Sequence, residues 1–102
     1  MNIKLLDVCD VSQIPEIGST KFSTDPIAYV KLFLPGSSWS WYIIEYDGKD
    51  ICFGYVRGDF DELGYFSLSE LKSVRGKLGL GVELDRSFNP TRLSVIKKHP
   101  YL

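Results

Sequence analysis

The feature that most constrains the fold is a pair of aromatic-rich segments on either side of Asp47-Gly48. Asp-Gly between two such segments is the strongest short signal for a β-hairpin. A two-residue loop would place Glu45 opposite Asp50, and directly opposed like charges destabilise a strand pair. The sequence therefore favours a four-residue loop that ends at Asp50. The two predicted strands cover residues 39–46 and 51–57.

Neighbouring side chains of a strand point to opposite faces, so the predicted hairpin has one aromatic face and one mixed face. We expect the aromatic face to be core, and its residues are Tyr42, Ile44, Tyr46, Ile51, Phe53 and Tyr55. The mixed face carries Trp41, Ile43, Glu45, Cys52, Gly54 and Val56. We expect this second face either to be partly solvated or to be covered by an irregular segment.

A helix start of unusual completeness follows the hairpin. Ser67 can cap the helix and Glu70 stands three residues later, which is the pattern of a capping box. Phe66 before the cap and Leu71 at the fourth helical position form a hydrophobic staple. The sequence therefore predicts a short helix near residues 67–75.

The remaining segments complete a small α+β fold. Thr91 follows Asn-Pro and is the expected cap of a second short helix near residues 91–98. β-branched and aromatic residues predict further strands at 27–33, 63–66 and 81–84. Strands first and short helices late indicate an antiparallel sheet of about four to five strands. We expect a single domain over residues 1–102, with an irregular lead-in at 1–26 and a core at 27–98.

Composition excludes several classes of protein. The chain has 102 residues, of which 44% are hydrophobic and 25% charged, as in ordinary globular domains. No apolar run approaches the ~20 residues of a membrane span, and the first residues do not resemble a signal peptide, so we expect a cytoplasmic protein. Cys9 and Cys52 are then expected to be free thiols, since cytosolic disulfides are rare. His99 is the single histidine, and we expect neither a metal nor a cofactor.

The charges are unevenly distributed along the chain. Residues 42–70 contain seven acidic residues against Lys49 and Arg57, whereas residues 86–102 contain four cationic residues and no acid. Either the molecule has an acidic side and a basic end, or the two segments neutralise each other in the fold.

Two motifs suggest chemistry and have simpler explanations. Asp59, Asp61 and Glu62 lack the ligand spacing of a calcium loop, so we interpret them as a solvated turn between strands. The glycine-rich segment 76–81 follows a helix instead of opening one, which is the wrong polarity for a phosphate loop. We interpret this segment as a connector.

The middle of the chain resembles a known family. The similarity rests on Trp39-x-Trp41-Tyr42, on Phe53-Gly54-x-Val56, on the run from Glu62 to Gly79 and on Phe88-x-Pro90. These motifs resemble the domain of unknown function 2958 family, whose members are small single-domain bacterial proteins. The resemblance implies a location on plasmids, phages and other mobile elements, and it implies no activity, cofactor or substrate.

Three functions are compatible with the sequence. The first is a non-enzymatic module that binds another protein, and its candidate surface consists of Trp39, Trp41, Glu62, Tyr65 and Arg75. Tryptophan and arginine are the side chains that dominate protein interfaces. The second is binding of nucleic acid or a nucleotide by exposed aromatic residues and the basic C-terminal tail. The third is a small enzyme that uses Glu62 and Arg75.

Overall fold

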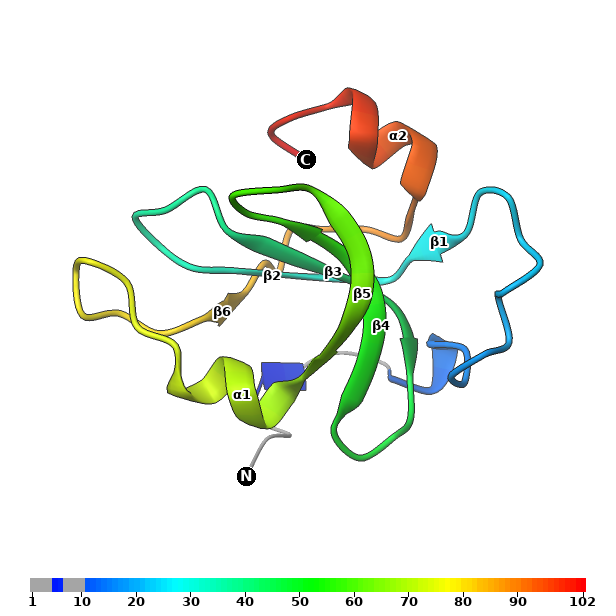
Figure 1. The fold of residues 1–102 in the computed structure, drawn as a ribbon, viewed down its shortest axis with the longest axis horizontal. Coiled ribbons are helices and arrows are strands. Elements are labelled where there is room, and N and C mark those ends of the chain that lie inside the picture. Colours follow the sequence, from blue (N-terminus) through cyan, green and yellow to red (C-terminus); the bar gives the residue numbers. More distant parts are fainter. Residues whose placement is uncertain (1–4, 7–10) are drawn as a thin grey trace.

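Short strands make up most of the regular structure in residues 5–6 and 11–102, which are the residues that the computed structural model describes (Figure 1). A 3-10 helix, η2 (Val11–Gln13), precedes them. The strands are β1 (Ile27–Ala28), β2 (Val30–Phe33), β3 (Ser40–Tyr46), β4 (Ile51–Arg57), β5 (Glu62–Ser67), β6 (Glu83–Leu84) and β7 (Thr91–Arg92). The α-helices are α1 (Leu68–Ser73) and α2 (Leu93–Lys98).

The strands form one antiparallel sheet of five and a second pair. The order in the larger sheet is β5-β4-β3-β2-β6, and β1 pairs with β7. This arrangement confirms the predicted α+β class. The predicted strand over 27–33 is divided into β1, which pairs with β7, and β2, which pairs with β3. Between them the N–H of Tyr29 donates to the carbonyl of Ile43 (2.8 Å).

The hairpin β3–β4 has the predicted four-residue loop. Asp47 Oδ1 accepts hydrogen bonds from the N–H groups of Lys49 (2.8 Å), Asp50 (2.8 Å) and Ile51 (3.0 Å). Gly48 adopts a φ of 82°, which side chains other than glycine rarely tolerate. The loop is therefore closed by one carboxylate and one glycine.

A β-bulge in β3 changes the predicted faces. The pairing of β3 with β4 skips Ile44, so Ile44 and Glu45 both lie on the face of Phe53. Tyr46 then pairs with Cys52 on the opposite face. The prediction was therefore wrong beyond the bulge, because the extra residue reverses the alternation and exchanges the faces of Glu45 and Tyr46.

Both faces of the sheet are covered. One cluster lies between the sheet and α2, and its buried members are Ala28, Tyr42, Ile44, Tyr55, Leu93 and Ile96. The larger cluster joins the other face to α1 and the lead-in, and its buried members are Leu6, Ile14, Val30, Leu32, Leu34, Trp41, Ile43, Tyr46, Cys52, Leu68, Leu71 and Val82. The face expected to be mixed is thus dry, and a largely irregular lead-in helps to cover it.

The predicted cap of α1 is present, and a distant residue adds to it. Ser67 Oγ accepts from the N–H of Glu70 (3.1 Å) and donates to its carboxylate (2.8 Å). Asp50 then accepts from the N–H (2.9 Å) and the hydroxyl (2.8 Å) of Ser69. The hairpin loop therefore fixes the start of the helix.

The predicted cap of α2 was wrong. Thr91 lies in β7 and donates to the carbonyl of Asn89 (2.6 Å). Asp25 caps the helix instead, because it accepts from the N–H (2.8 Å) and the hydroxyl (2.7 Å) of Ser94. The pairing of β7 with β1 holds Thr91 in an extended conformation and brings Asp25 to the helix end.

Of the two cysteines, Cys9 lies outside the described residues. Cys52 is a free, fully buried thiol in the larger core cluster. Burial raises the pKa of Cys52 to about 12, and the nearby carboxylates of Asp47 and Asp50 add to this effect. At neutral pH this thiol is therefore protonated and acts as a packing group.

Candidate functional site

The two tryptophans cover the sheet. Trp41 is only 6% exposed and belongs to the larger core cluster. Trp39 is half-buried and stacks on Trp41, with ring centroids 5.9 Å apart and an interplanar angle of 27°. A Cβ at Gly58 would lie 2.3 Å from the Trp39 ring, so the backbone of the β4–β5 loop closes over this ring.

Glu62 and Tyr65 lie on opposite faces of the sheet. Glu62 pairs with Val56, which in turn pairs with Trp41, so Glu62 belongs to the tryptophan face. Tyr65 pairs with Phe53 and points to the other face, where it is 66% exposed.

Arg75 belongs to neither group. It follows α1, and its Nη1 donates to the backbone carbonyls of Lys72 (2.7 Å) and Val74 (2.9 Å). Within residues 5–6 and 11–102, Arg75 and Glu62 form no ion pair. The five residues predicted to make one surface are therefore divided among two sheet faces and a turn.

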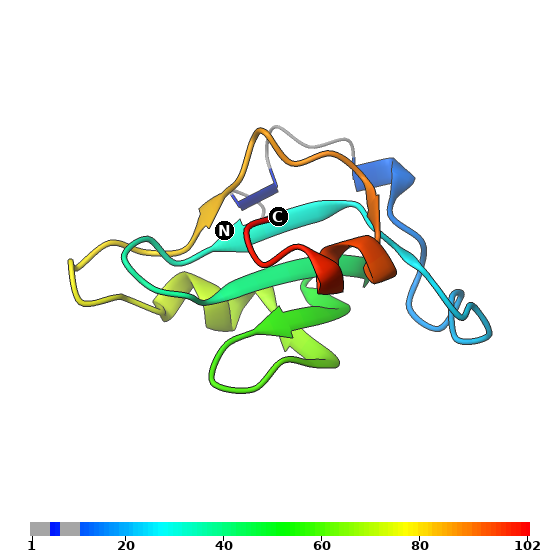
Figure 2. The same ribbon diagram turned by 90° about the horizontal axis from the view of Figure 1, so that it is seen from above.

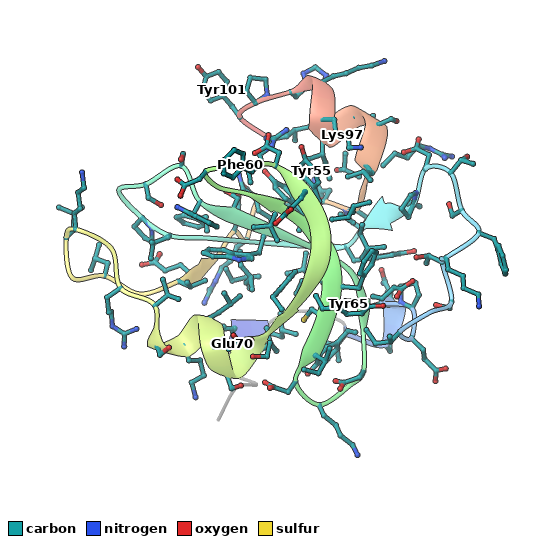
Figure 3. The ribbon with its side chains drawn as sticks, in the orientation of Figure 1. Tyr55, Phe60, Tyr65, Glu70, Lys97 and Tyr101 are labelled. Atoms are coloured by element: carbon teal, nitrogen blue, oxygen red, sulfur yellow. The ribbon has the colours of Figure 1, made fainter. Side chains whose placement is uncertain are left out.

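A pocket of about 390 Å³ lies on the Tyr65 side of the sheet, between the sheet, α2 and the lead-in. Figure 3 shows Tyr65 and Lys97 on the same side of β5. The lining residues, which define the Tyr65 pocket, are Gly18, Thr20, Lys21, Ser23, Thr24, Pro26, Glu45, Phe53, Leu63, Tyr65, Leu93 and Lys97. Its volume is within the range of small-molecule sites, about 300–1,000 Å³.

The sheet side of the Tyr65 pocket is aromatic and apolar. The rings of Phe53 and Tyr65 lie 5.0 Å apart at an angle of 56°. Leu63, which is 45% exposed, lies on the same face because it shares the alternation of Tyr65. This part of the sheet face is thus left uncovered by α2.

Glu45 ties the lead-in to the sheet at one wall of the pocket. Its carboxylate accepts hydrogen bonds from the N–H of Gly18 (2.7 Å), the N–H of Thr20 (2.9 Å) and the hydroxyl of Thr20. Burial acts to raise the pKa of Glu45, but these three hydrogen bonds together outweigh it and the pKa is lowered. Glu45 is therefore a charged structural anchor whose oxygens already have donors.

The α2 wall is held by two side chains from other elements. Asp25 caps its start through Ser94, as described above. Arg57 lies at its end, where Nη1 donates to the carbonyl of His99 (3.0 Å) and Nη2 to the carbonyl of Ile96. These contacts place Lys97 over the ring of Tyr55, with Nζ 5.8 Å from the centroid.

The outer edge of β5 is a second candidate site. β5 ends the five-stranded sheet, and within the described part of the chain it pairs with β4 alone (Figure 2). Four acidic residues and no Lys or Arg occur in residues 58–71, and the acids are Asp59, Asp61, Glu62 and Glu70. The β5 edge is thus an exposed strand flanked in the sequence by acids, whereas Lys21 and Lys97 line the pocket on its Tyr65 face.

The described residues contain neither a membrane-spanning helix nor a metal-binding cluster. Neither α1 nor α2 has the length and apolar character needed to cross a membrane, and this part of the chain holds no other α-helix. Over the same residues, no three His, Cys, Asp or Glu side chains gather where they could hold a metal ion.

The sequence of the chain matches the model of a known protein family. The model of a family described as a protein of unknown function, DUF2958, matches residues 9–99. The chain belongs to this family. The match covers both faces of the sheet, both helices and the Tyr65 pocket of this DUF2958 protein. No curated protein and no solved structure matches the chain.

Several pocket residues were not among the predicted site residues. Phe53 and Leu63 could have been found from the alternation that places them beside Tyr65. Lys21 and Lys97 had no such signal, because they come from the lead-in and from α2, and only the tertiary fold brings them to the pocket.

Proposed function

We propose that this DUF2958 protein is a non-enzymatic module that binds an extended, basic segment of another protein along the β5 edge. The observation that carries the proposal is that β5 is the last strand of its sheet and has no neighbour on its outer side among the described residues. An unpaired edge offers a row of backbone N–H and C=O groups to an added strand.

Strand addition would use both the backbone and the side chains of β5. An incoming segment pairs with the free backbone groups, and its alternate side chains lie beside those of the edge strand. Leu63 and Tyr65 provide apolar contact on one face, where they are 45% and 66% exposed. The length of β5, six residues, is enough for a short strand pairing.

The acidic residues near both ends of β5 favour a basic partner segment. Glu62 begins β5, Asp61 directly precedes it, and Glu70 lies in α1 just beyond its end, so an added strand would have carboxylates near both of its ends. Lysine or arginine near the ends of the segment would find favourable partners there. A second copy of this chain would instead bring like charges together, since it carries the same acids.

The proposal includes a cellular setting. The resemblance to small bacterial proteins of mobile elements supports a role in the cytoplasm for such an element, acting on a host or element-encoded protein. Binding along a strand edge requires no catalytic group, so we propose no enzymatic activity.

The test uses two synthetic peptides of alternating valine and threonine, one flanked by lysines and the other by glutamates. Each is titrated into the ¹⁵N-labelled protein, and backbone amide shifts are followed by NMR. We expect the lysine-flanked peptide to shift the amides of residues 62–67 and to bind at least tenfold more tightly than the glutamate-flanked one.

A variant with Asp61→Lys and Glu62→Lys supplies the matched control, because both side chains are exposed. The preference between the two peptides should then reverse while the melting temperature changes little. Equal binding of both peptides, or shifts confined to residues outside β5, would contradict the proposal. Binding of an unstructured oligonucleotide at these same amides, together with no binding of the lysine-flanked peptide, would instead favour the nucleic-acid function.

A further inference from the structure

We propose that the Tyr65 pocket binds a nucleotide, with the base against Tyr65 and the phosphate near Lys97 and Lys21. This site shares the side chains of Leu63 and Tyr65 with the proposed strand-addition surface, but it does not use the backbone groups of the β5 edge. The inference does not rest on the strand-addition proposal, because the lysine-flanked peptide tests that proposal and the monophosphates test this one. It rests on three features of the pocket: an exposed ring, cationic groups from two different segments, and acids whose oxygens already accept hydrogen bonds.

The exposed ring offers a stacking surface. Tyr65 leans on Phe53 at 5.0 Å, which supports one side of its ring, and 66% of the residue remains exposed. Leu63 extends the apolar surface beside it. A planar base can stack on such a ring, and each stacked base contributes about 1–3 kcal/mol in single-stranded nucleic-acid complexes.

The cationic groups approach from different segments. Lys97 belongs to α2 and Lys21 to the lead-in, and both line the pocket. Lys97 Nζ lies 5.8 Å from the ring of Tyr55, and Lys21 Nζ lies 5.1 Å from the ring of Phe22. Neither forms an ion pair with an acid among the described residues. Hydrogen bonds are the main cause of the lowered pKa of Asp25, and Lys97 does lie near enough to this carboxylate to contribute to it. A phosphate would supply the direct partner that both lysines lack.

The nearby acids form no ion pair with these two lysines within the described residues. Glu45 lines the pocket, but both of its oxygens accept hydrogen bonds from Gly18 and Thr20. Asp25 holds Ser94 through both carboxylate oxygens. The hydroxyl-bearing residues Ser23 and Thr24 also line the pocket, and they supply polar groups of the kind that a sugar or a base edge needs.

The probes are adenosine monophosphate, uridine monophosphate, adenosine, inorganic phosphate and a six-residue uridine oligonucleotide. Each is titrated into the protein while amide shifts are recorded by NMR. We expect the two monophosphates to shift residues that line the pocket and to bind at least tenfold more tightly than adenosine or phosphate alone, because only they offer both the ring and the anion.

Two variants form a matched pair. Lys97→Glu reverses the charge at the pocket, whereas Lys98→Glu makes the same change at the next residue, which is exposed and does not line the pocket. We expect the first to weaken nucleotide binding at least tenfold and the second less than twofold. Tyr65→Ala should also weaken binding at least tenfold, with the melting temperature measured for each variant.

The titration with the oligonucleotide distinguishes a free nucleotide from a strand of nucleic acid as the ligand. Tighter binding of the oligonucleotide, with a steep dependence on salt, assigns the pocket to a strand of nucleic acid. Equal or weaker binding assigns it to a free nucleotide, and both outcomes support the inference. Phosphate that binds as tightly as the monophosphates, an equal loss in Lys98→Glu, or shifts outside the pocket would each overturn it.

Discussion

Gly54 lies where the backbone of β3 closely approaches that of β4, and replacing it with alanine should destabilise the fold. A Cβ at this position would lie 1.9 Å from the carbonyl oxygen of Tyr42, 2.9 Å from its carbonyl carbon and 3.3 Å from the Cα of Ile43. Each of these is a backbone atom of the neighbouring strand, so rotation of a side chain cannot relieve the contact.

The size of the effect follows from the displacement that is needed. Ordinary contact begins at about 3.4 Å, so the strands must separate by about 1.5 Å beside the bulge. Overpacking of a core typically costs about 1–3 kcal/mol, and each ladder hydrogen bond that is lost adds about 1 kcal/mol. We therefore expect Gly54→Ala to lower the free energy of unfolding by about 3 kcal/mol, which corresponds to a fall in Tm of about 12–24 °C.

The opposing residue of β5 provides the control. Gly64 pairs with Gly54, and a Cβ there would meet nothing within 4 Å. Gly64→Ala should change stability by less than about 1 kcal/mol, and in the stabilising direction, because alanine restricts the unfolded chain. Urea denaturation of the two variants measures both effects. Equal stability of Gly54→Ala and Gly64→Ala would refute the close approach of β3 and β4 at the bulge.

Three further predictions concern single side chains. Ser67→Ala should destabilise the protein by about 1 kcal/mol in urea denaturation, because the N–H of Glu70 loses its acceptor. Since the folded pKa of Glu45 lies below its ordinary value of 4.5, its contribution to stability is complete above that value and is lost as the pH falls through the lower folded pKa. Glu45→Gln should therefore flatten the dependence of Tm on pH in this acidic range. Cys52 should not react with a thiol reagent in the native protein at pH 8 and should react fully in urea, since burial raises its pKa to about 12.

Local signals in the sequence were enough to predict the hairpin and the first helix. The loop closed by Asp47 and the cap at Ser67 depend on residues within four positions of each other. Interactions over so few residues can be predicted directly from the sequence. The α+β class and the five-stranded sheet followed from the same kind of signal. The β1–β7 pair did not, because 27–33 was expected as one strand and 91–98 as a helix.

The bulge at Ile44 could not be predicted in this way. All of the residues from Trp41 to Tyr46 suit a regular strand, and alternation gives no sign of an extra one. The structure places Glu45 next to Gly18 and Thr20, so the bulge turns a charged side chain toward donors in the lead-in. Thr20, one of these donors, lies 25 residues before Glu45 in the sequence, so local patterns do not reveal it.

The candidate site was predictable only in part, for the same reason. Tyr65 was expected in a binding surface, and it lines the pocket. Trp39 and Trp41 were expected there too, but the alternation of β3 and the stacking of their rings direct them to the larger core cluster. Large aromatic side chains serve binding surfaces and cores equally well, and sequence alone does not separate these uses.

The walls of the pocket are joined to one another by contacts within the protein. An isolated helix of six residues is not stable in water, so α2 depends on its tertiary contacts. Asp25 supplies one of these contacts, and it belongs to the same lead-in segment that forms the facing wall. Glu45 attaches that segment to the sheet. The sheet, the lead-in and α2 are thus joined by two carboxylates, and a ligand would not have to order these walls itself, which lowers the entropic cost of binding.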